Sequence, residues 1–355
     1  MRGPTVKYIA FLCAGLALAV AFAQDTPSRE QRIENWLRIQ DADNDGRISA
    51  DEATGQMKGN FRRIDVNNDS FLDKQELGAL AERLGQNQAA RRTPQLITDD
   101  QIRQQAAAGV LLELDIPYRE GHELWTLDLA MPAVESDRPR PAIILVHGGG
   151  WVRGDKRNPN FVELMLDYAA RGYVAINVNY RLDRSKLPCV KDVKCAVRWL
   201  RAHAAKYNVD PGRIGAYGNS AGAHLVAMLG LSHGERRLDS GPWLDHSSAV
   251  QAVAASATPA RPNVPGGTEA DNALISPLTY IAAAAPPFLL FHEASDSTVN
   301  VSNSDDLVSA LKNAGATEVI YKRYTDGSGH GVFRANFEET APEMRRFFAR
   351  SLGTE

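Results

Sequence analysis

From residue 110 to the end of the chain, short apolar runs alternate with longer stretches of helical periodicity, and this alternation limits the possible folds more than any other feature. The apolar runs are 142–147, 173–179, 213–217, 250–255, 288–292 and 318–324. The helical stretches are 161–170, 192–206, 221–231, 305–313 and 337–351. Runs without a polar face are typical of strands that are covered by helices on both sides. The pattern predicts an α/β fold with a mainly parallel sheet, opened by a strand pair at 110–115 and 123–131.

The chain has 355 residues, more than one hydrophobic core usually covers, so we expect two folded units. Hydrophobic residues make up 44% and charged residues 23%, as in an ordinary soluble protein, which excludes disordered, collagen-like and polytopic membrane classes. The 40 Lys and Arg nearly balance the 43 Asp and Glu. A net charge of −3 argues against a nucleic-acid partner.

Residues 1–23 have the layout of a secretory signal peptide. Arg2 and Lys7 precede an uncharged apolar run at 8–23, which ends in Ala21-Phe22-Ala23. The run is shorter than the roughly 20 residues that span a membrane. We therefore expect a secreted or periplasmic protein, without a membrane span once the signal is cleaved.

Cleavage would leave two cysteines, Cys189 and Cys195. On one continuous helix they would lie about 9 Å apart along the axis, beyond the reach of a disulfide. They could form a bridge if Cys189 lay in the turn before the helix, a place that Pro188 allows. Two unpaired thiols agree with the sequence equally well.

Residues 41–52 match a twelve-residue calcium-binding loop. Side-chain oxygens fall at positions 1, 3 and 5, a glycine at position 6 allows the sharp turn, and a glutamate at position 12 could bind through both oxygens. The expected ligands are Asp41, Asp43, Asp45, the backbone carbonyl of Arg47, and Glu52. Ile48, at position 8, suits the short strand that pairs two such loops.

A second copy begins at Asp65. Its expected ligands are Asp65, Asn67, Asp69, the carbonyl of Phe71, Asp73 and Glu76. Ser70 replaces the usual glycine, so this residue must adopt a left-handed conformation, and we expect the second site to be the weaker one. Leu72 takes the strand position.

Helical spacing flanks the two loops, with Ile33, Trp36 and Leu37 before the first and Leu77, Leu80 and Leu84 after the second. Residues 30–84 thus resemble an EF-hand pair, which implies structural Ca²⁺ and a small all-α module at 24–86. The following residues are polar and lack apolar periodicity, so 87–108 are predicted to be a linker. A catalytic domain is expected at 109–355.

Gly218-Asn219-Ser220-Ala221-Gly222 lies after a predicted strand and before a predicted helix. This G-x-S-x-G pattern in that context is typical of a nucleophile elbow, in which two glycines allow a turn tight enough to expose the serine hydroxyl. Ser220 is therefore the predicted nucleophile.

His147-Gly148-Gly149-Gly150-Trp151 ends the first strand of the parallel series. Consecutive glycines leave backbone N–H groups unobstructed, and such donors stabilise the oxyanion of acyl transfer. The expected oxyanion hole consists of the N–H groups of Gly149, Gly150 and Ala221. A phosphate-binding P-loop is excluded because no Lys-Ser/Thr follows the glycines.

A serine nucleophile requires a base and an acid that orients the base. His330, in a glycine-rich loop after the last strand, is the predicted base. The acid should follow the preceding strand, where Asp296 is the first choice and Glu293 the alternative. His147 is expected to shape the glycine loop, and His224, one turn past Ser220, to form local bonds. Trp151 could line the acyl pocket or contribute to packing.

Four segments, 141–151, 192–200, 213–225 and 286–299, resemble secreted α/β-hydrolase esterases of the carboxylesterase and acetyl-xylan/feruloyl-esterase type. The resemblance covers about 109–352, and the His-Gly-Gly-Gly loop is shared with hormone-sensitive-lipase-like esterases. It implies an α/β-hydrolase fold, a Ser220, Asp296, His330 triad, and an ester substrate, either a small molecule or an acetylated or feruloylated polysaccharide. No cofactor is expected in the catalytic step.

Two positions depart from that family. The His-Gly that commonly precedes the acidic loop is His292-Glu293 here, which could add negative charge near the triad. The usual Gly-Pro-x-Asp is replaced by residues 256–261, Ser-Ala-Thr-Pro-Ala-Arg, in a segment expected to border the substrate.

The expected activity is a serine carboxylic-ester hydrolase that works through an acyl-serine intermediate. One alternative is a prolyl-oligopeptidase-like serine peptidase, which has the same triad order, although the chain lacks room for the accompanying propeller. A second alternative is a catalytically inactive calcium-dependent binding protein.

Overall fold

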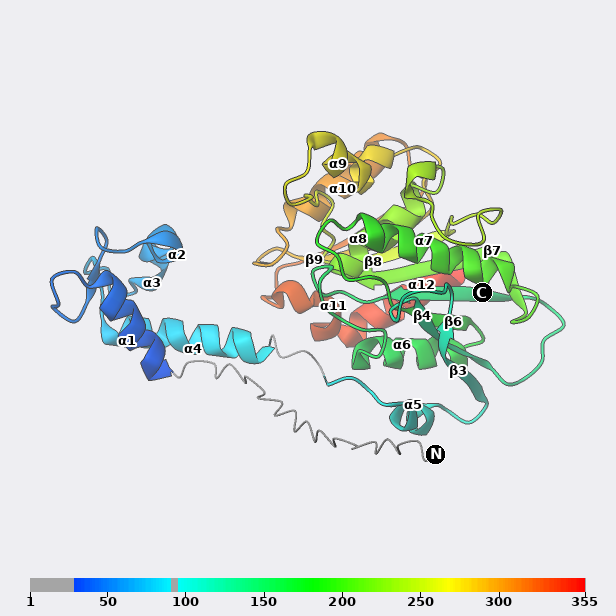
Figure 1. Cartoon of the computed structure of the whole chain (residues 1–355), viewed down its shortest axis with the longest axis horizontal. Coiled ribbons are helices and arrows are strands. Elements are labelled where there is room, and N and C mark those ends of the chain that lie inside the picture. The colour runs from blue at the N-terminus through cyan, green and yellow to red at the C-terminus, as the bar shows by residue number, and fades with distance from the viewer. Residues whose placement is uncertain (1–28, 91–94, 355) are drawn as a thin grey trace, which may run out of the picture. The chain divides into compact units, whose positions relative to one another are not determined.

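The computed structural model describes residues 29–90 and 95–354 (Figure 1). The predicted signal peptide at 1–23 lies outside these residues. The chain divides into two compact units, Met1–Arg92 and Thr93–Glu355. This division falls within the predicted linker. Among the helices in the two described ranges, none is both long and apolar enough to cross a bilayer.

The first unit is a small helical module in which a short strand pair joins two acidic loops. Its elements are α1 (Arg29–Gln40), β1 (Ile48–Ser49), α2 (Gly55–Gly59), α3 (Phe61–Ile64), β2 (Phe71–Leu72) and α4 (Lys74–Ala90). β1 and β2 are antiparallel, with Ile48 opposite Leu72, so the predicted strand positions of the two loops do pair. Both side chains are fully buried, in a core that includes Phe61, Ile64 and Leu77.

The second unit is built around an eight-stranded sheet in the order β10-β9-β8-β7-β5-β6-β4-β3. The strands are β3 (Val110–Pro117), β4 (Thr126–Pro132), β5 (Arg140–Val146), β6 (Val174–Val178), β7 (Val209–Asn219), β8 (Ala252–Ser256), β9 (Phe288–Glu293) and β10 (Val319–Tyr324). The pairings from β10 to β6 are parallel, while β3 with β4 and β4 with β6 are antiparallel. The prediction of a mainly parallel sheet opened by a strand pair is confirmed.

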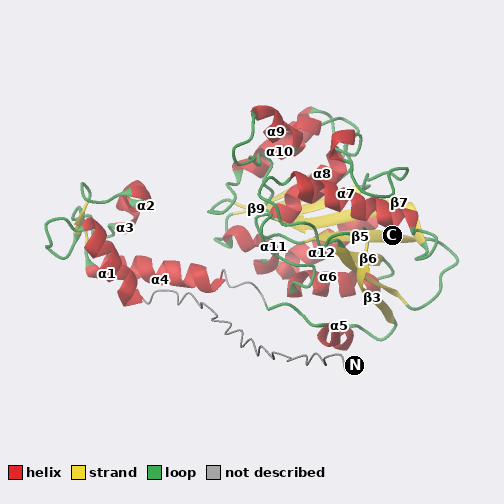
Figure 2. Ribbon diagram, in the orientation of Figure 1, coloured by secondary structure: helices red, strands yellow, loops and turns green. Residues whose placement is uncertain are grey.

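Helices cover both faces of this sheet (Figure 2). The helices of this unit are α5 (Asp99–Gln105), α6 (Pro159–Ala170), α7 (Leu187–Ala202), α8 (Ala221–Leu231), α9 (Glu269–Leu274), α10 (Ser302–Asn313), α11 (Val332–Ala335) and α12 (Phe337–Leu352). Three short 3₁₀ helices, η1 (Arg236–Leu238), η2 (Pro277–Tyr280) and η3 (Gly329–Gly331), lie in the connections. The predicted helices match α6, α7, α8, α10 and α12, although α7 begins five residues earlier than the pattern indicated.

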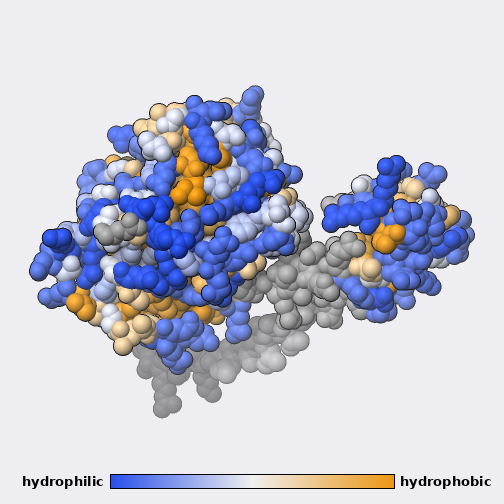
Figure 3. Space-filling view, turned by 180° about the vertical axis from the view of Figure 1, so that it is seen from behind, coloured by the Kyte–Doolittle hydropathy of each residue, from blue (hydrophilic) through white to orange (hydrophobic). Residues whose placement is uncertain are grey.

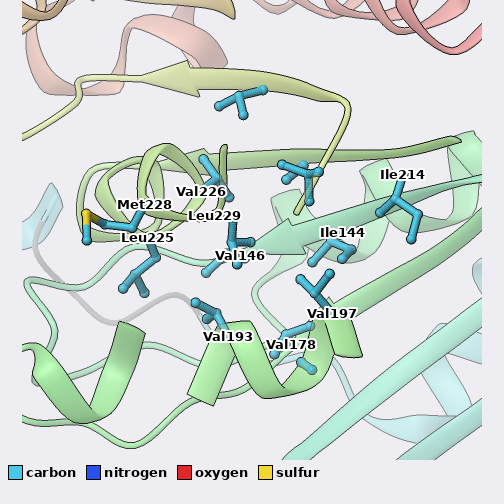
Figure 4. Packing of buried hydrophobic residues seen from close by; sticks show 14 of the residues in the cluster. Ile144, Val146, Val178, Val193, Val197, Ile214, Leu225, Val226, Met228 and Leu229 are labelled. Carbon is cyan, nitrogen blue, oxygen red and sulfur yellow. The ribbon is translucent and has the colours of Figure 1, made fainter. Parts of the chain in front are cut away.

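Successive residues of β5 alternate between two cores. Ile144 and Val146 pack with α7 and α8, including Val193 and Leu225, as Figure 4 shows. Ile143 and Leu145 belong to the core that α6 and α12 complete on the other face. Because strand side chains alternate between faces, a strand buried on both sides must be apolar throughout, which explains its uniform sequence. The face shown in Figure 3 is mainly hydrophilic, with an elongated apolar patch in the upper part of the larger unit and further apolar residues along its lower edge.

The predicted linker is shorter than 87–108. α4 continues to Ala90, and the chain from residue 95 onward belongs to the second unit, where the Ile97 N–H donates to the Arg157 carbonyl at 3.1 Å. Thr98 and Gln101 form a reciprocal capping box at the start of α5, and Ile102 is fully buried. Arg157 also binds Asp99 at 2.6 Å. The sequence of α5 shows no periodic apolar pattern because the helix is short and buries only one isoleucine. Its capping box and its ion pair stabilise it instead.

Cys189 and Cys195 are unpaired. Both lie in α7, and both are fully buried. Since Cys189 is the third residue of the helix and does not lie in the turn before it, the geometry needed for a disulfide does not arise.

Candidate active site

Ser220 lies in a sharp turn between β7 and α8. Its φ of 53° and ψ of −122° place a non-glycine residue in a strained backbone conformation. The Ser220 N–H donates to the carbonyl of Ser256 at the end of β8, at 2.9 Å. The turn is thus attached to the neighbouring strand, with the serine at the carboxyl edge of the sheet.

The two outer glycines of the turn are required by packing. A Cβ on Gly218 would overlap the backbone of Gly222, and a Cβ on Gly222 would overlap the carbonyl of Val146. Neither neighbour can yield, because both are backbone groups within the fold's core. The G-x-S-x-G spacing therefore reflects close contact of α8 with β5 and β7 as well as the turn itself.

Three residues from three loops form a continuous hydrogen-bonded chain. Nε2 of His330 lies 2.9 Å from Oγ of Ser220, and Nδ1 of His330 lies 2.8 Å from Oδ2 of Asp296. A carboxylate accepts at Nδ1, so Nδ1 carries the proton and Nε2 is free to accept from the serine hydroxyl. The structure thus brings the predicted nucleophile, base and acid together with the polarity that proton abstraction needs.

Asp296 is held by donors on both of its oxygens. The N–H groups of Thr298 and Val299 donate to Oδ1 at 2.8 and 3.0 Å, and Nε2 of His292 lies 3.2 Å from Oδ2. Burial raises the pKa of Asp296, but the hydrogen bonds from His292, His330 and the backbone outweigh it and keep the pKa well below its usual range. The carboxylate therefore stays ionised opposite His330.

Glu293, the alternative acid, makes no bond to the His330 imidazole among the contacts of the described residues. It is the last residue of β9 and is buried, and its carboxylate accepts from backbone and hydroxyl groups instead. Between the two predicted acids, the structure favours Asp296.

The glycine loop lies directly against the nucleophile turn. A Cβ on Gly148 would come within 2.9 Å of the Asn219 carbonyl and 3.3 Å of the Ser220 Cβ. Gly149 and Gly150 both have positive φ, 127° and 62°. Ala221 is the first residue of α8, where helix N–H groups have no partner within the helix. The three predicted oxyanion donors thus lie on the two segments that flank Ser220.

His147 and His224 have different neighbours. Nδ1 of His147 lies 2.7 Å from the Gly148 carbonyl, and the ring stacks on Tyr180 at 4.5 Å, which agrees with a role in shaping the glycine loop. The expectation of local bonds for His224 is wrong. Its Nδ1 accepts from the Trp151 indole at 3.1 Å, and its Nε2 donates to the Ile275 carbonyl at 2.7 Å. These partners are 73 and 51 residues away, so no spacing along the chain could have revealed them.

Known proteins resemble this second unit. Residues 127–261 match the BD-FAE family model. Esterase LipQ of Mycobacterium tuberculosis is 33% identical over 235 residues, covering 58% of this chain and 54% of its own. A carbohydrate esterase from gut microbiota has a TM-score of 0.61 at 25% identity, over 70% of this chain and 99% of its own. Thermogutta terrifontis esterase 2 has a TM-score of 0.59 at 28% identity, over 68% and 94%.

The second unit has the α/β-hydrolase fold. The sheet order, the serine turn after β7 and the agreement with these esterase structures all support this. The chain spans 54–62% of the length of three curated relatives that it matches, the esterases LipQ and LipC and the probable carboxylic ester hydrolase LipM.

A pocket of about 130 Å³ opens beside His330 in the α/β-hydrolase unit. Its apolar lining includes Phe161, Tyr217, Phe333 and Phe337. Ser256 also lines it, whereas residues 257–260, expected to border the substrate, are buried. A larger cavity of about 450 Å³, lined by the charged Asp115, Lys156 and Arg157, contacts none of the three triad residues.

The acidic loops of the first unit form two carboxylate clusters. Asp41, Asp43 and Asp45 form one, and Asp65, Asp69 and Glu76 form the other, with ligand atoms within 4.8 Å of one another. Oxygen ligands of this kind fit a hard cation such as Ca²⁺. Ser70 has a φ of 69°, close to the 83° of Gly46, so the predicted left-handed turn at this position is confirmed.

Glu52, expected to be a ligand in the first loop, is not part of the first cluster. Its carboxylate accepts from the Ser49 N–H and hydroxyl, both at 2.8 Å, and from the Ala42 N–H at 2.9 Å. These bonds, chiefly those from Ser49, lower the pKa of Glu52 to about 2. Asn67 bonds within its own loop, where it accepts from the Asp69 N–H at 2.9 Å. Of the two residues whose carbonyls were expected to be ligands, Arg47 directly precedes β1 and Phe71 is the first residue of β2.

Proposed function

We propose that this protein is a serine carboxylic-ester hydrolase that works through an acyl-serine intermediate. The observation that carries the proposal is the chain of hydrogen bonds from Ser220 through His330 to Asp296, beside a glycine loop. Relatives and structural neighbours named as esterases support an ester substrate. One neighbouring structure shows its esterase phosphorylated by paraoxon, a reaction that is informative for testing this chain.

In the first half of the reaction, Nε2 of His330 takes the proton of Ser220 as Oγ bonds to the ester carbonyl carbon. The carbonyl π electrons move onto its oxygen, and the N–H groups of Gly149, Gly150 and Ala221 stabilise the resulting oxyanion. Each such donor is worth about 3–4 kcal/mol in comparable sites. The oxyanion then reforms the carbonyl, the C–O bond to the alcohol breaks, and His330 gives its proton to the departing oxygen.

In the second half, His330 removes a proton from water, which attacks the acyl-serine. Collapse of that intermediate releases the carboxylic acid and returns the proton to Ser220. Asp296 accepts a hydrogen bond from Nδ1–H throughout, which fixes the tautomer and stabilises the imidazolium that forms in each half. Both halves use the same base and the same oxyanion donors.

The substrate we infer is an acetylated or feruloylated polysaccharide. Structural neighbours described as a carbohydrate esterase and as a bifunctional GH43-CE protein support this inference. A screen of acyl-chain lengths on aryl esters, run beside acetyl- and feruloyl-xylan, tests it. Release of acid from small esters alone would restrict the substrate to small molecules.

We also propose that the first unit binds Ca²⁺ for stability and that residues 1–23 direct export to the periplasm or exterior. The two carboxylate clusters support the calcium proposal. Chelation should lower the melting temperature of the first unit and leave turnover unchanged. A severalfold loss of turnover without loss of hydrolase stability would instead make Ca²⁺ regulatory.

Replacing the nucleophile tests the main proposal. Ser220→Ala should reduce hydrolysis of a short-chain aryl ester to below a few per cent of the wild-type rate and abolish labelling by a fluorophosphonate. Ser240→Ala, a serine away from the triad, serves as the matched control and should keep both. Retained turnover in Ser220→Ala would overturn the assignment, and cleavage of proline-containing peptides instead of esters would favour a peptidase.

A further inference from the structure

Glu293 stands at the junction of the two loops that carry the base and the acid. It is the last residue of β9 and pairs with Tyr324, the last residue of the parallel neighbour β10. The loop after β9 carries Asp296, and the loop after β10 carries His330. Glu293 is only 1% exposed, so its carboxylate is enclosed between the start of one loop and the body of the other.

One oxygen of this carboxylate bonds to both loops. Oε2 accepts from the Ser295 N–H at 2.8 Å and the Ser295 hydroxyl at 2.6 Å in the acid loop. The same oxygen accepts from the Gly329 N–H at 3.2 Å in the histidine loop, one residue before His330. The backbone of Gly327 also hydrogen-bonds to the carboxylate. Gly327 and Gly329 have positive φ, 77° and 59°, a turn that directs neighbouring N–H groups toward an anion.

The Asp296–His330 contact itself and the bond from the Ala294 N–H to the Tyr324 carbonyl, at 2.9 Å, also join the two segments, but several other bonds of these loops act within one loop. Asp326 accepts from the Ser328 N–H and hydroxyl inside the histidine loop, and Asp296 accepts from Thr298 and Val299 inside the acid loop. Such bonds shape each loop but do not set the separation between them. A group that bonds to both loops does set it, and the separation governs the contact from His330 to Asp296.

A carboxylate suits this task better than a neutral group. Hydrogen bonds to a charged acceptor are shorter and about twice as strong as neutral ones. The Ser295 hydroxyl, and then the backbone donors, lower the pKa of Glu293, so it stays ionised at neutral pH.

We propose that Glu293 is a positioning residue that holds the His330 loop against the Asp296 loop in the geometry for proton transfer. The proposal rests on the proposed ester hydrolysis. Its role is indirect, because the bonds of its carboxylate among the described residues go to Ser295 and to the backbone of the histidine loop rather than to the imidazole. Its loss should lower the rate of the chemical step and leave substrate binding largely intact.

The test compares Glu293→Ala and Glu293→Gln with Glu235→Ala in the intact chain. Glu235 is a matched control because it also accepts from the backbone N–H two residues ahead, that of Arg237 at 3.0 Å, but it contacts neither triad loop. We measure kcat and KM on an aryl ester, the melting temperature, and the low-field proton resonance of His330 Nδ1–H by NMR.

Glu293→Ala should lower kcat by about ten- to a hundredfold, as expected for small misplacements of catalytic groups, with KM changed less than about twofold. Its low-field resonance should shift or broaden. Glu293→Gln keeps an acceptor oxygen but forms the weaker neutral bond, so its kcat should lie about two- to fivefold below wild type, with a smaller shift of the resonance. Glu235→Ala should match wild type in kcat, KM and the resonance.

A kcat for Glu293→Ala within twofold of wild type would overturn the proposal, as would a lower kcat with an unchanged resonance. If Glu293→Ala fails to fold, Glu293→Gln decides: wild-type kcat with an unshifted resonance overturns the proposal, and a lower kcat with a shifted resonance supports it. Failure of the ester-hydrolase proposal would appear separately, as retained activity in Ser220→Ala.

Discussion

Gly222, the last glycine of the serine turn, lies against the carbonyl oxygen of Val146 at the end of β5. A Cβ at this position would overlap that oxygen and would also come within 2.7 Å of the His147 carbonyl. The same small residue therefore lets α8 approach β5 and brings the glycine loop close to Ser220. The contact between Gly222 and Val146 therefore serves both the packing of α8 on β5 and the placement of the glycine loop beside Ser220.

Gly222→Ala should destabilise the α/β-hydrolase unit by about 2–3 kcal/mol or more, because overpacking against backbone cannot be relieved by a rotamer change. Urea unfolding measures the loss. Gly234→Ala is the control, since a Cβ there meets nothing within 4 Å and should change stability by less than about 0.5 kcal/mol. Equal stability of the two variants would contradict the packing argument.

Asp296→Asn should lower kcat by about 10³–10⁴-fold with little change in fold, the size of effect known for amide substitution in serine triads. The amide can donate to Nδ1, which favours the tautomer that carries its proton on Nε2 and cannot accept from Ser220. Steady-state kinetics and the rate of fluorophosphonate labelling both report this loss. Asp306→Asn, at an exposed ion pair with Arg261, should keep the wild-type rate; a similar loss there would point to a general electrostatic effect.

His224 should make the protein sensitive to mild acid. Burial lowers its pKa from 6.5 to about 4, so between these values the unfolded chain binds the extra proton. Stability from this group is complete above pH 6.5 and falls as the pH drops toward 4. Wild type should lose about 2 kcal/mol more between pH 7 and pH 5 than His224→Gln, measured by urea unfolding. If the free energy of unfolding fell by the same amount with pH in both proteins, the buried His224 would not be the source of the acid sensitivity.

Ser70 and Gly46 should control the relative strength of the two proposed calcium sites. Both loops turn through a positive φ at the sixth position, which costs a non-glycine residue about 1–2 kcal/mol. Ser70→Gly should tighten Ca²⁺ binding at the second loop about fivefold, and Gly46→Ser should weaken the first by a similar factor. Calorimetric titration of the intact chain measures both. Unchanged affinities in both variants would remove backbone strain as the reason for a weaker second site.

Most of the architecture could be predicted because its signals are local. The uniformly apolar strands, the intervening helices and the paired loop strands at Ile48 and Leu72 all appear where their sequence patterns placed them. α5 was missed because a capping box at Thr98 and one buried Ile102 leave no periodic trace. Its stability comes from the surface it covers, including the ion pair from Asp99 to Arg157.

The sequence by itself determined which residues could perform acyl transfer, because a G-x-S-x-G turn and a glycine run are short-range requirements of backbone geometry. The tertiary structure decided which acid hydrogen-bonds to His330, which distant residues hydrogen-bond to His224, and which two loops hydrogen-bond to Glu293. Those outcomes depend on β9 and β10 lying side by side and on α8 packing between distant loops. Spacing along a chain carries no record of such contacts, since they arise only when parallel strands bring their carboxyl ends to one edge.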